Sequence, residues 1–120
     1  MIDTDSFQNL EIWGGFELVR IQLISDRLTD AIGREALAKT SIVGRRFEIV
    51  IRTPLSEDEL SVTIYHEILE AATVASNTPP TNVRMFSEGD FERAAYRAHA
   101  ELGAASAATI DRMLQSYGFR

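Results

Sequence analysis

A single short stretch of this chain holds the residues whose types and spacing could do chemistry. His66, one of only two histidines, is followed by Glu67 and, four positions further on, by Glu70. Side chains four residues apart lie one turn apart on the same face of a helix, so His66 and Glu70 could both reach a single metal ion. Glu67, next to the histidine, would then act as the general base that activates a metal-bound water. This spacing indicates a metal-dependent hydrolytic site.

Glu67 and Glu70 have no basic partner close to them in the sequence. No Lys or Arg occurs between Arg52 and Arg84, whereas ion pairs within a helix join residues three or four apart. The helical projection also places apolar side chains on both sides of the line formed by His66 and Glu70. Because a carboxylate in apolar surroundings is costly unless it is paired, protonated or bound to a cation, a metal ion would satisfy these groups. The simpler interpretation is a pair of His66 and Glu70 that stabilises the helix by about 0.2–0.5 kcal/mol.

A zinc site needs a third ligand, and a later helical segment offers two candidates. Glu92 and His99 are seven residues apart and share a helical face to within about 20°. A set of His66, Glu70 and His99 matches the two-histidine, one-glutamate arrangement of catalytic zinc sites. A set with Glu92 in place of His99 has one histidine and two carboxylates, which suits harder ions better. Ligand chemistry therefore favours His99, and Glu92 stays open as the alternative.

Composition sets the class of protein and removes several kinds of chemistry. The chain has 120 residues, of which 45% are hydrophobic and 25% charged, as expected for one globular domain over residues 1–120. The absence of cysteine means that any Zn²⁺ must be bound by His, Asp and Glu. A formal net charge of −6 argues against a nucleic-acid partner, and no apolar run approaches the length of a membrane span. The N-terminus has no signal-peptide pattern, so a cytoplasmic protein is expected.

The remaining sequence supplies the elements that must position the His66 stretch. Alternating apolar residues predict two strands, over residues 16–25 with Val19, Ile21 and Leu23 inward, and over residues 46–52 with Phe47, Ile49 and Ile51 inward. Helical spacing predicts helices over residues 28–38, 57–75 and 88–102, and a last helix that begins after Ser106. Residues 1–15 and 77–86 show no regular pattern.

Local signals support the ends of the predicted helices. Ser56 stands three residues before Glu59, which is the pattern of a capping box at a helix start. Gly118 and Phe119 resemble a C-terminal glycine cap with its hydrophobic contact. We therefore expect an α+β domain in which a small sheet of two or three strands packs against the central helix 57–75 and further C-terminal helices.

The run from Tyr65 to Ala72 resembles the active-site helix of zincin-like metallopeptidases, particularly small phage-associated and bacterial ones whose helix reads His-Glu-x-x-His-Ala. In some compact relatives a glutamate replaces the second histidine, as Glu70 does here. The resemblance implies a metal at His66 and Glu70, with Glu67 as the base. It also implies a third ligand from a following helix, often a glutamate in a Glu-x-x-Ala-type context. Glu92 stands in such a context, so the resemblance favours it as the third ligand.

Motif and resemblance together predict a compact zincin-like metal-binding protein, a Zn²⁺-dependent peptidase or hydrolase that acts on a peptide or protein substrate. The alternative is a noncatalytic domain of the same fold that binds a protein partner or self-associates. Such a domain would keep the helix 57–75 but would bind no metal.

Overall fold

The fold is built on a four-stranded mixed sheet in the computed structural model, which describes residues 2–29 and 32–120. The strands lie in the order β1 (Leu10–Ile12), β2 (Phe16–Ile24), β6 (Arg46–Arg52) and β5 (Ala38–Val43). β2 and β6 are parallel, whereas β1 with β2 and β5 with β6 are antiparallel. β5 is therefore an edge strand, and its outer side pairs with no other strand among the described residues.

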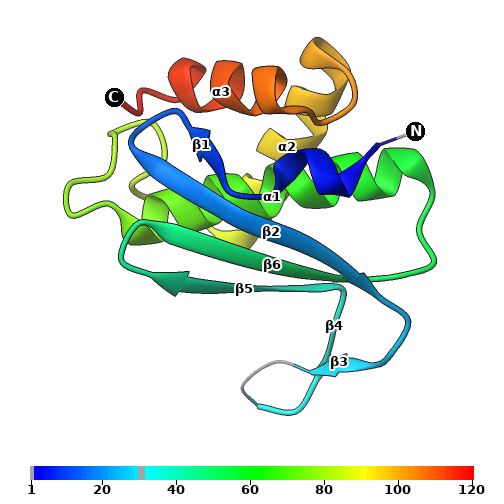
Figure 1. Ribbon diagram of the computed structural model, residues 1–120. Coiled ribbons are helices and arrows are strands. Elements are labelled where there is room, and N and C mark those ends of the chain that lie inside the picture. The colour runs from blue at the N-terminus through cyan, green and yellow to red at the C-terminus, as the bar shows by residue number, and fades with distance from the viewer. Residues whose placement is uncertain (1, 30–31) are drawn as a thin grey trace.

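Three helices follow the sheet in the sequence and complete an α+β fold. They are α1 (Glu57–Ala75), α2 (Glu88–Leu102) and α3 (Ala107–Ser116). Figure 1 shows α1 running behind the sheet with α2 packed on it, while α3 lies beside β1. The α+β class and the three predicted C-terminal helices are thus confirmed. Within the described part of the chain, no helix combines the length and apolar composition needed to cross a membrane.

Each helix begins where a serine side chain can cap it. The three N-caps, each with a capping box, are Ser56, Ser87 and Ser106. After α3, Gly118 has a φ of +97°, and the N–H of Phe119 donates to the carbonyl of Leu114 at 3.1 Å. The Phe119 ring is buried, so the predicted glycine cap with its hydrophobic contact is confirmed.

The core lies between the sheet and α1. The strand side chains with no exposed surface are Leu18, Phe47, Ile49 and Ile51. On α1, Ile64 and Ile68 are also fully buried against this layer. Burial of large apolar side chains is the main stabilising contribution in such a layer. Because this face holds α1 against the sheet, the neighbouring face that carries Glu67 turns toward β5.

A β-bulge in β2 changes which of its residues are buried. The register between β2 and β6 shifts between Leu18 and Arg20, so Val19 interrupts the alternation. Leu18 faces the core before the bulge and Ile21 faces it afterwards, whereas Leu23 is 40% exposed. The predicted inward face is therefore right at Ile21 and interrupted at Val19, because the extra residue reverses the direction of the side chains on its two sides. Leu23 lies on the same face as Ile21 and is exposed nearer the end of the strand.

The helix predicted over residues 28–38 is wrong. β3 (Leu28–Thr29) and β4 (Glu35–Ala36) form an antiparallel pair here, which Figure 1 shows projecting away from the helices. Gly33 has a φ of +86°, a left-handed conformation that ends a right-handed helix. Leu28 pairs with Ala36 across the hairpin. Apolar residues eight positions apart can therefore lie on one face of a helix or opposite each other in a hairpin. Ala31, another apolar position in the helical pattern, lies outside the described residues.

The sheet has four strands, and the predicted two or three is wrong because β1 and β5 were missed. Residues 1–15, expected to be irregular, contain the 3₁₀-helix η1 (Thr4–Phe7) as well as β1. β1 is only three residues long, too short for alternation to identify. β5 alternates between partly and fully exposed positions along its whole length. Such a strand lacks the strong apolar pattern of a half-buried one.

Candidate metal centre

The Nε2 atom of His66 faces carboxylates from two helices. It lies 3.1 Å from Oε2 of Glu70, one turn further along α1, and 2.8 Å from Oε1 of Glu88, the first residue of α2. Ligand atoms of His66, Glu67 and Glu70 all lie within 4.8 Å of one another. The His66 side chain is only 17% exposed, and its ring stacks on Phe91 with the centroids 6.4 Å apart. His66, Glu67 and Glu70 therefore form a partly buried cluster on α1, and Glu88, whose side chain is 72% exposed, contacts its histidine from α2.

Glu67 is held from the side of the sheet. The hydroxyl of Thr40, on β5, donates to Oε1 of Glu67 at 2.9 Å. Burial raises the pKa of Glu67, and the hydrogen bond from Thr40 and the charge of His66 act against that rise. A carboxylate with a raised pKa is a better proton acceptor near neutral pH than an exposed one. The sheet edge therefore both orients Glu67 and shields part of it from solvent.

Glu70 differs from Glu67 in the direction of its pKa shift. The hydrogen bond with His66 lowers the pKa of Glu70, against the opposing effect of burial. Glu70 is therefore ionised at neutral pH, as a metal ligand must be. Two glutamates three residues apart thus have pKa values shifted in opposite directions, an arrangement that separates a ligand from a base.

Two hollows meet at Glu67 and form a groove between β5 and the helices, named here the β5 groove. The larger, of about 400 Å³, has His66, Glu88 and Glu92 in its lining. The smaller, of about 230 Å³, lies between β5 and the C-terminal half of α1. Ala38 and Glu67 border both hollows. A ligand lying along β5 would therefore pass directly over the cluster.

The cluster fits a divalent cation by the type and spacing of its donor atoms. An imidazole nitrogen with carboxylate oxygens suits zinc and harder divalent ions. Two ligand atoms bound tetrahedrally to one zinc ion lie about 3.4 Å apart, given metal–ligand distances of 2.0–2.1 Å. The two carboxylate oxygens lie 3.1 and 2.8 Å from Nε2 of His66. Each of these two pairs would have to separate by less than about 1 Å to reach the spacing of zinc ligands.

In the metal-free protein, His66 makes stability depend on pH. The hydrogen bond with Glu70 raises the pKa of His66 above its ordinary 6.5; burial opposes the rise, and the charges of Glu67 and Glu88 add to it. A raised folded-state pKa contributes stability that is complete below the unfolded pKa and is lost as pH rises through the folded pKa. We therefore expect the free energy of unfolding, measured with urea, to fall as the pH rises above 6.5.

The control for this prediction is His66→Asn, in which the fall above pH 6.5 should shrink. Glu67, whose pKa is also raised, changes stability in the same direction, so the comparison between the two proteins isolates the histidine. An equal fall in the wild type and in His66→Asn would contradict the prediction.

The structure does not bring His99 to His66. The Nδ1 atom of His99 lies 2.8 Å from the hydroxyl of Ser61, and Nε2 lies 3.4 Å from Oδ1 of Asp58. Both partners belong to the first half of α1, so His99 joins α2 to α1 away from the cluster. The set of His66, Glu70 and His99 that ligand chemistry favoured is therefore not assembled. Ser61 is also no exposed nucleophile, since its side chain is fully buried.

Replacing Ser61 by alanine should destabilise the fold by about 1–3 kcal/mol. The Ser61 hydroxyl accepts the buried N–H of Ala105 at 2.9 Å and contacts His99, so its loss leaves both groups without that partner. Urea denaturation measures the change. Ser41→Ala, at an exposed position of β5, is the matched control and should stay within about 0.5 kcal/mol of the wild type. Equal effects of the two substitutions would refute this role of Ser61.

Two residues of the site were missed in the sequence. Glu92 lines the same hollow as His66, but the carboxylate in contact with the histidine is that of Glu88, one turn earlier on α2. Since Glu88 and Glu92 are four residues apart, they lie on the same face of the helix. The helical periodicity that made Glu92 a candidate ligand therefore makes Glu88 one as well. Thr40 had no comparable signal, because β5 shows too weak a pattern to be recognised as a strand.

The described residues thus bring one histidine, three glutamates and one threonine to a groove beside an edge strand. Such a set can bind a divalent cation and place a base next to it. Comparisons of the chain with protein-family models, with curated proteins and with solved structures found no match.

Proposed function

We propose that this chain is a compact zincin-like hydrolase that binds Zn²⁺ and cleaves peptide bonds. The observation that carries the proposal is the convergence of Glu70 and Glu88 on Nε2 of His66, at 3.1 and 2.8 Å, with Glu67 alongside and bonded to the sheet edge. The likeness to zincins rests on the His-Glu-x-x-Glu helix and on the edge strand that lies beside it.

Three residues are proposed to hold the ion. His66 and Glu70 lie on one face of α1, and Glu88 approaches the same atom from α2. Glu88 thereby takes the role for which Glu92 and His99 were the candidates. A bound Zn²⁺ would supply Lewis-acid polarisation of the scissile carbonyl and a lower pKa for water.

Glu67 is the proposed general base. It accepts the proton of the attacking water and can then return it to the leaving amine. Its raised pKa suits this exchange near neutral pH, because the carboxylate must be ionised to accept the proton and basic enough to keep it. Thr40 is a positioning residue, since its hydroxyl fixes one oxygen of Glu67 and leaves the other for water.

The unpaired edge of β5 supports a peptide as the substrate. An extended peptide can add to such an edge by hydrogen bonds between main chains, with side-chain pockets at alternate positions. The two hollows of the β5 groove flank Glu67, so a peptide along β5 would extend on both sides of the base. A peptide bond would then lie over the cluster. The net charge predicts that the substrate is not a nucleic acid. The N-terminal sequence predicts a cytoplasmic location. Both stay predictions.

Zinc reconstitution tests the proposal. After dialysis against excess Zn²⁺ and then buffer, we expect elemental analysis to find about one zinc ion per chain, as three protein ligands predict. We further expect cleavage of a mixture of unstructured peptides, detected by mass spectrometry, to stop with EDTA and to return with added zinc. A protein without stoichiometric metal would overturn the proposal. Stoichiometric metal without cleavage would refute the peptidase and leave a metal-binding domain.

A further inference from the structure

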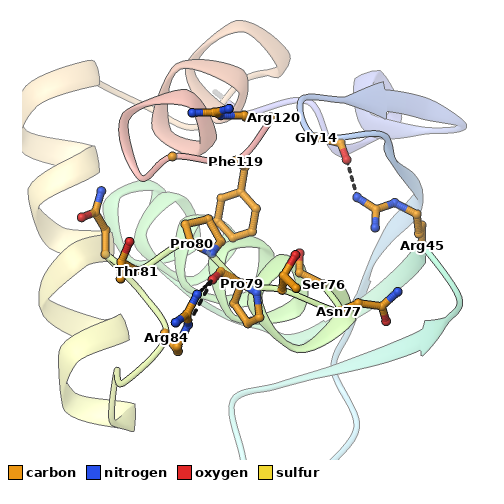
Figure 2. Close-up of a pocket in the computed structure, with 13 residues that line it drawn as sticks. Gly14, Arg45, Ser76, Asn77, Pro79, Pro80, Thr81, Arg84, Phe119 and Arg120 are labelled. Atoms are coloured by element: carbon orange, nitrogen blue, oxygen red, sulfur yellow. Dashed lines mark hydrogen bonds between the residues drawn. The ribbon is translucent and has the colours of Figure 1, made fainter.

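A second hollow, of about 660 Å³, lies away from the candidate metal centre (Figure 2). It shares no lining residue with the β5 groove. Three arginines from separate parts of the chain line it: Arg45 from the turn between β5 and β6, Arg84 from the loop before α2, and Arg120 after α3. Over the described ranges 2–29 and 32–120, its lining contains no Asp or Glu.

This charge pattern is unusual for the molecule, which has 18 acidic and 12 basic residues. Several arginines outside the hollow form ion pairs with carboxylates; examples are Arg20, Arg27, Arg46, Arg52 and Arg93. Among the described residues, no Asp or Glu forms an ion pair with Arg45, Arg84 or Arg120. The hollow therefore gathers three guanidinium groups that no Asp or Glu of the described residues pairs with.

Two of these guanidinium groups are held in place by backbone carbonyls. Nε and Nη2 of Arg84 donate to the carbonyl of Pro79 at 3.3 and 3.0 Å. Arg45 donates to the carbonyls of Gly14 and Gly15 and lies over the Phe16 ring, 4.2 Å from its centroid. In each case these contacts use two of the five N–H donors. Fixed cations with donors remaining lose little conformational entropy when an anion binds.

Between the arginines, the hollow is lined by both apolar and polar side chains. Figure 2 shows Pro79, Pro80 and Phe119 between Arg84 on one side and Arg45 on the other. Hydroxyl and amide side chains from residues 76–82 complete the lining. The volume falls within the range of about 300–1,000 Å³ that small-molecule sites occupy. The hollow is thus of a size for a small ligand that carries both charged and apolar parts.

We propose that this hollow binds a small phosphorylated molecule. Guanidinium groups around one hollow favour a ligand with several anionic oxygens, and a phosphoryl group presents three oxygens and a charge near −2. The planar guanidinium fork matches phosphate oxygens in pairs. The partly exposed side chains of Pro79 and Pro80 then contact the apolar part of the ligand. The site is independent of the metal centre and of the hydrolase proposal.

The chain contains a built-in reporter for this site. Trp13 is the single tryptophan, and its indole N–H donates to the carbonyl of Phe119 at 2.6 Å. Pyrophosphate, which carries the phosphoryl groups alone, is the probe, and its binding to the full chain is followed by Trp13 fluorescence. We expect a saturable change that weakens as the NaCl concentration rises, because screening reduces interactions between exposed charges. A thermal-shift measurement supplies a second readout.

Arg84→Gln and Arg45→Gln should each weaken pyrophosphate binding by about tenfold or more, as expected for the loss of a charge-assisted hydrogen bond. Arg27→Gln, on β3's flank and paired with Glu35, changes the net charge equally and should bind within about twofold of the wild type. Two arginine variants are used so that a local disturbance of the Pro79 loop by one does not decide the result.

Three results would overturn the proposal. One is the absence of both a saturable fluorescence change and thermal stabilisation. Another is equal weakening in Arg27→Gln, which would reveal a general charge effect. The third is binding of citrate as tight as that of pyrophosphate, which would refute the assignment of a phosphoryl ligand in favour of anions in general.

Discussion

Replacing Glu67 by glutamine is expected to slow zinc-dependent peptide hydrolysis by about 100-fold to 10,000-fold, the contribution of a positioned general base. Glutamine keeps the size of the side chain and can still accept the hydrogen bond from Thr40, but it cannot accept the proton of the attacking water. Zinc should still bind, because His66, Glu70 and Glu88 are unchanged. Peptide cleavage rates and elemental analysis of the same preparation measure both effects.

Glu101→Gln is the matched control for this substitution. Glu101 is exposed on α2, away from the cluster. Its replacement by glutamine is the same chemical change as in Glu67→Gln, so the variant should cleave peptides at the rate of the wild type. Wild-type cleavage by the Glu67→Gln protein would remove the proposed base. Loss of zinc from that protein would instead place Glu67 among the ligands. Because Glu67 lies close to His66 and Glu70, this measurement is needed to distinguish a ligand from a base.

His66→Asn is expected to lower zinc affinity by more than about 100-fold, since even the outer partners of metal ligands contribute about 10-fold to 100-fold. His66 supplies the one imidazole of the cluster, and its Nε2 is the atom that Glu70 and Glu88 both approach. Competition with a fluorescent zinc chelator measures the affinity. The titration is best made above pH 7, because protonation of the histidine competes with the metal and its pKa is raised.

His99→Asn separates this site from the alternative ligand set. His99 is bonded to Ser61 and Asp58, so its loss should reduce stability while zinc affinity stays within about twofold of the wild type. Equal losses of affinity in the two histidine variants would show that His99 does reach the ion. The same titration on Glu88→Gln and Glu92→Gln identifies the third ligand, and we expect the larger loss in Glu88→Gln.

The three C-terminal helices were predictable because their signals are local. Ser56, Ser87 and Ser106 each precede the residue that completes a capping box, three positions later. The spacing of apolar residues then continues until the next turn signal. No contact with a distant part of the chain is needed to recognise such a pattern.

The strands were less predictable because their burial depends on partners elsewhere. The bulge at Val19 comes from the pairing of β2 with β6, and it brings both Leu18 and Ile21 to the core, which simple alternation does not allow. Leu28 and Ala36 fit a helical spacing equally well, but they pair across a hairpin. β5 gains its stability from β6 and not from an apolar face of its own.

The sequence alone determined that His66, Glu67 and Glu70 share one region of a helix, because a helical period relates residues three and four apart without reference to the rest of the fold. Only the tertiary structure decided what approaches them. The packing of α2 on α1 brings Glu88 to the histidine and sends His99 to Ser61. A helix can present any side to its neighbour, and its rotation is set by the burial of distant apolar side chains. For that reason the local pattern identified the first two candidate ligands, and the third candidate depended on the packed fold.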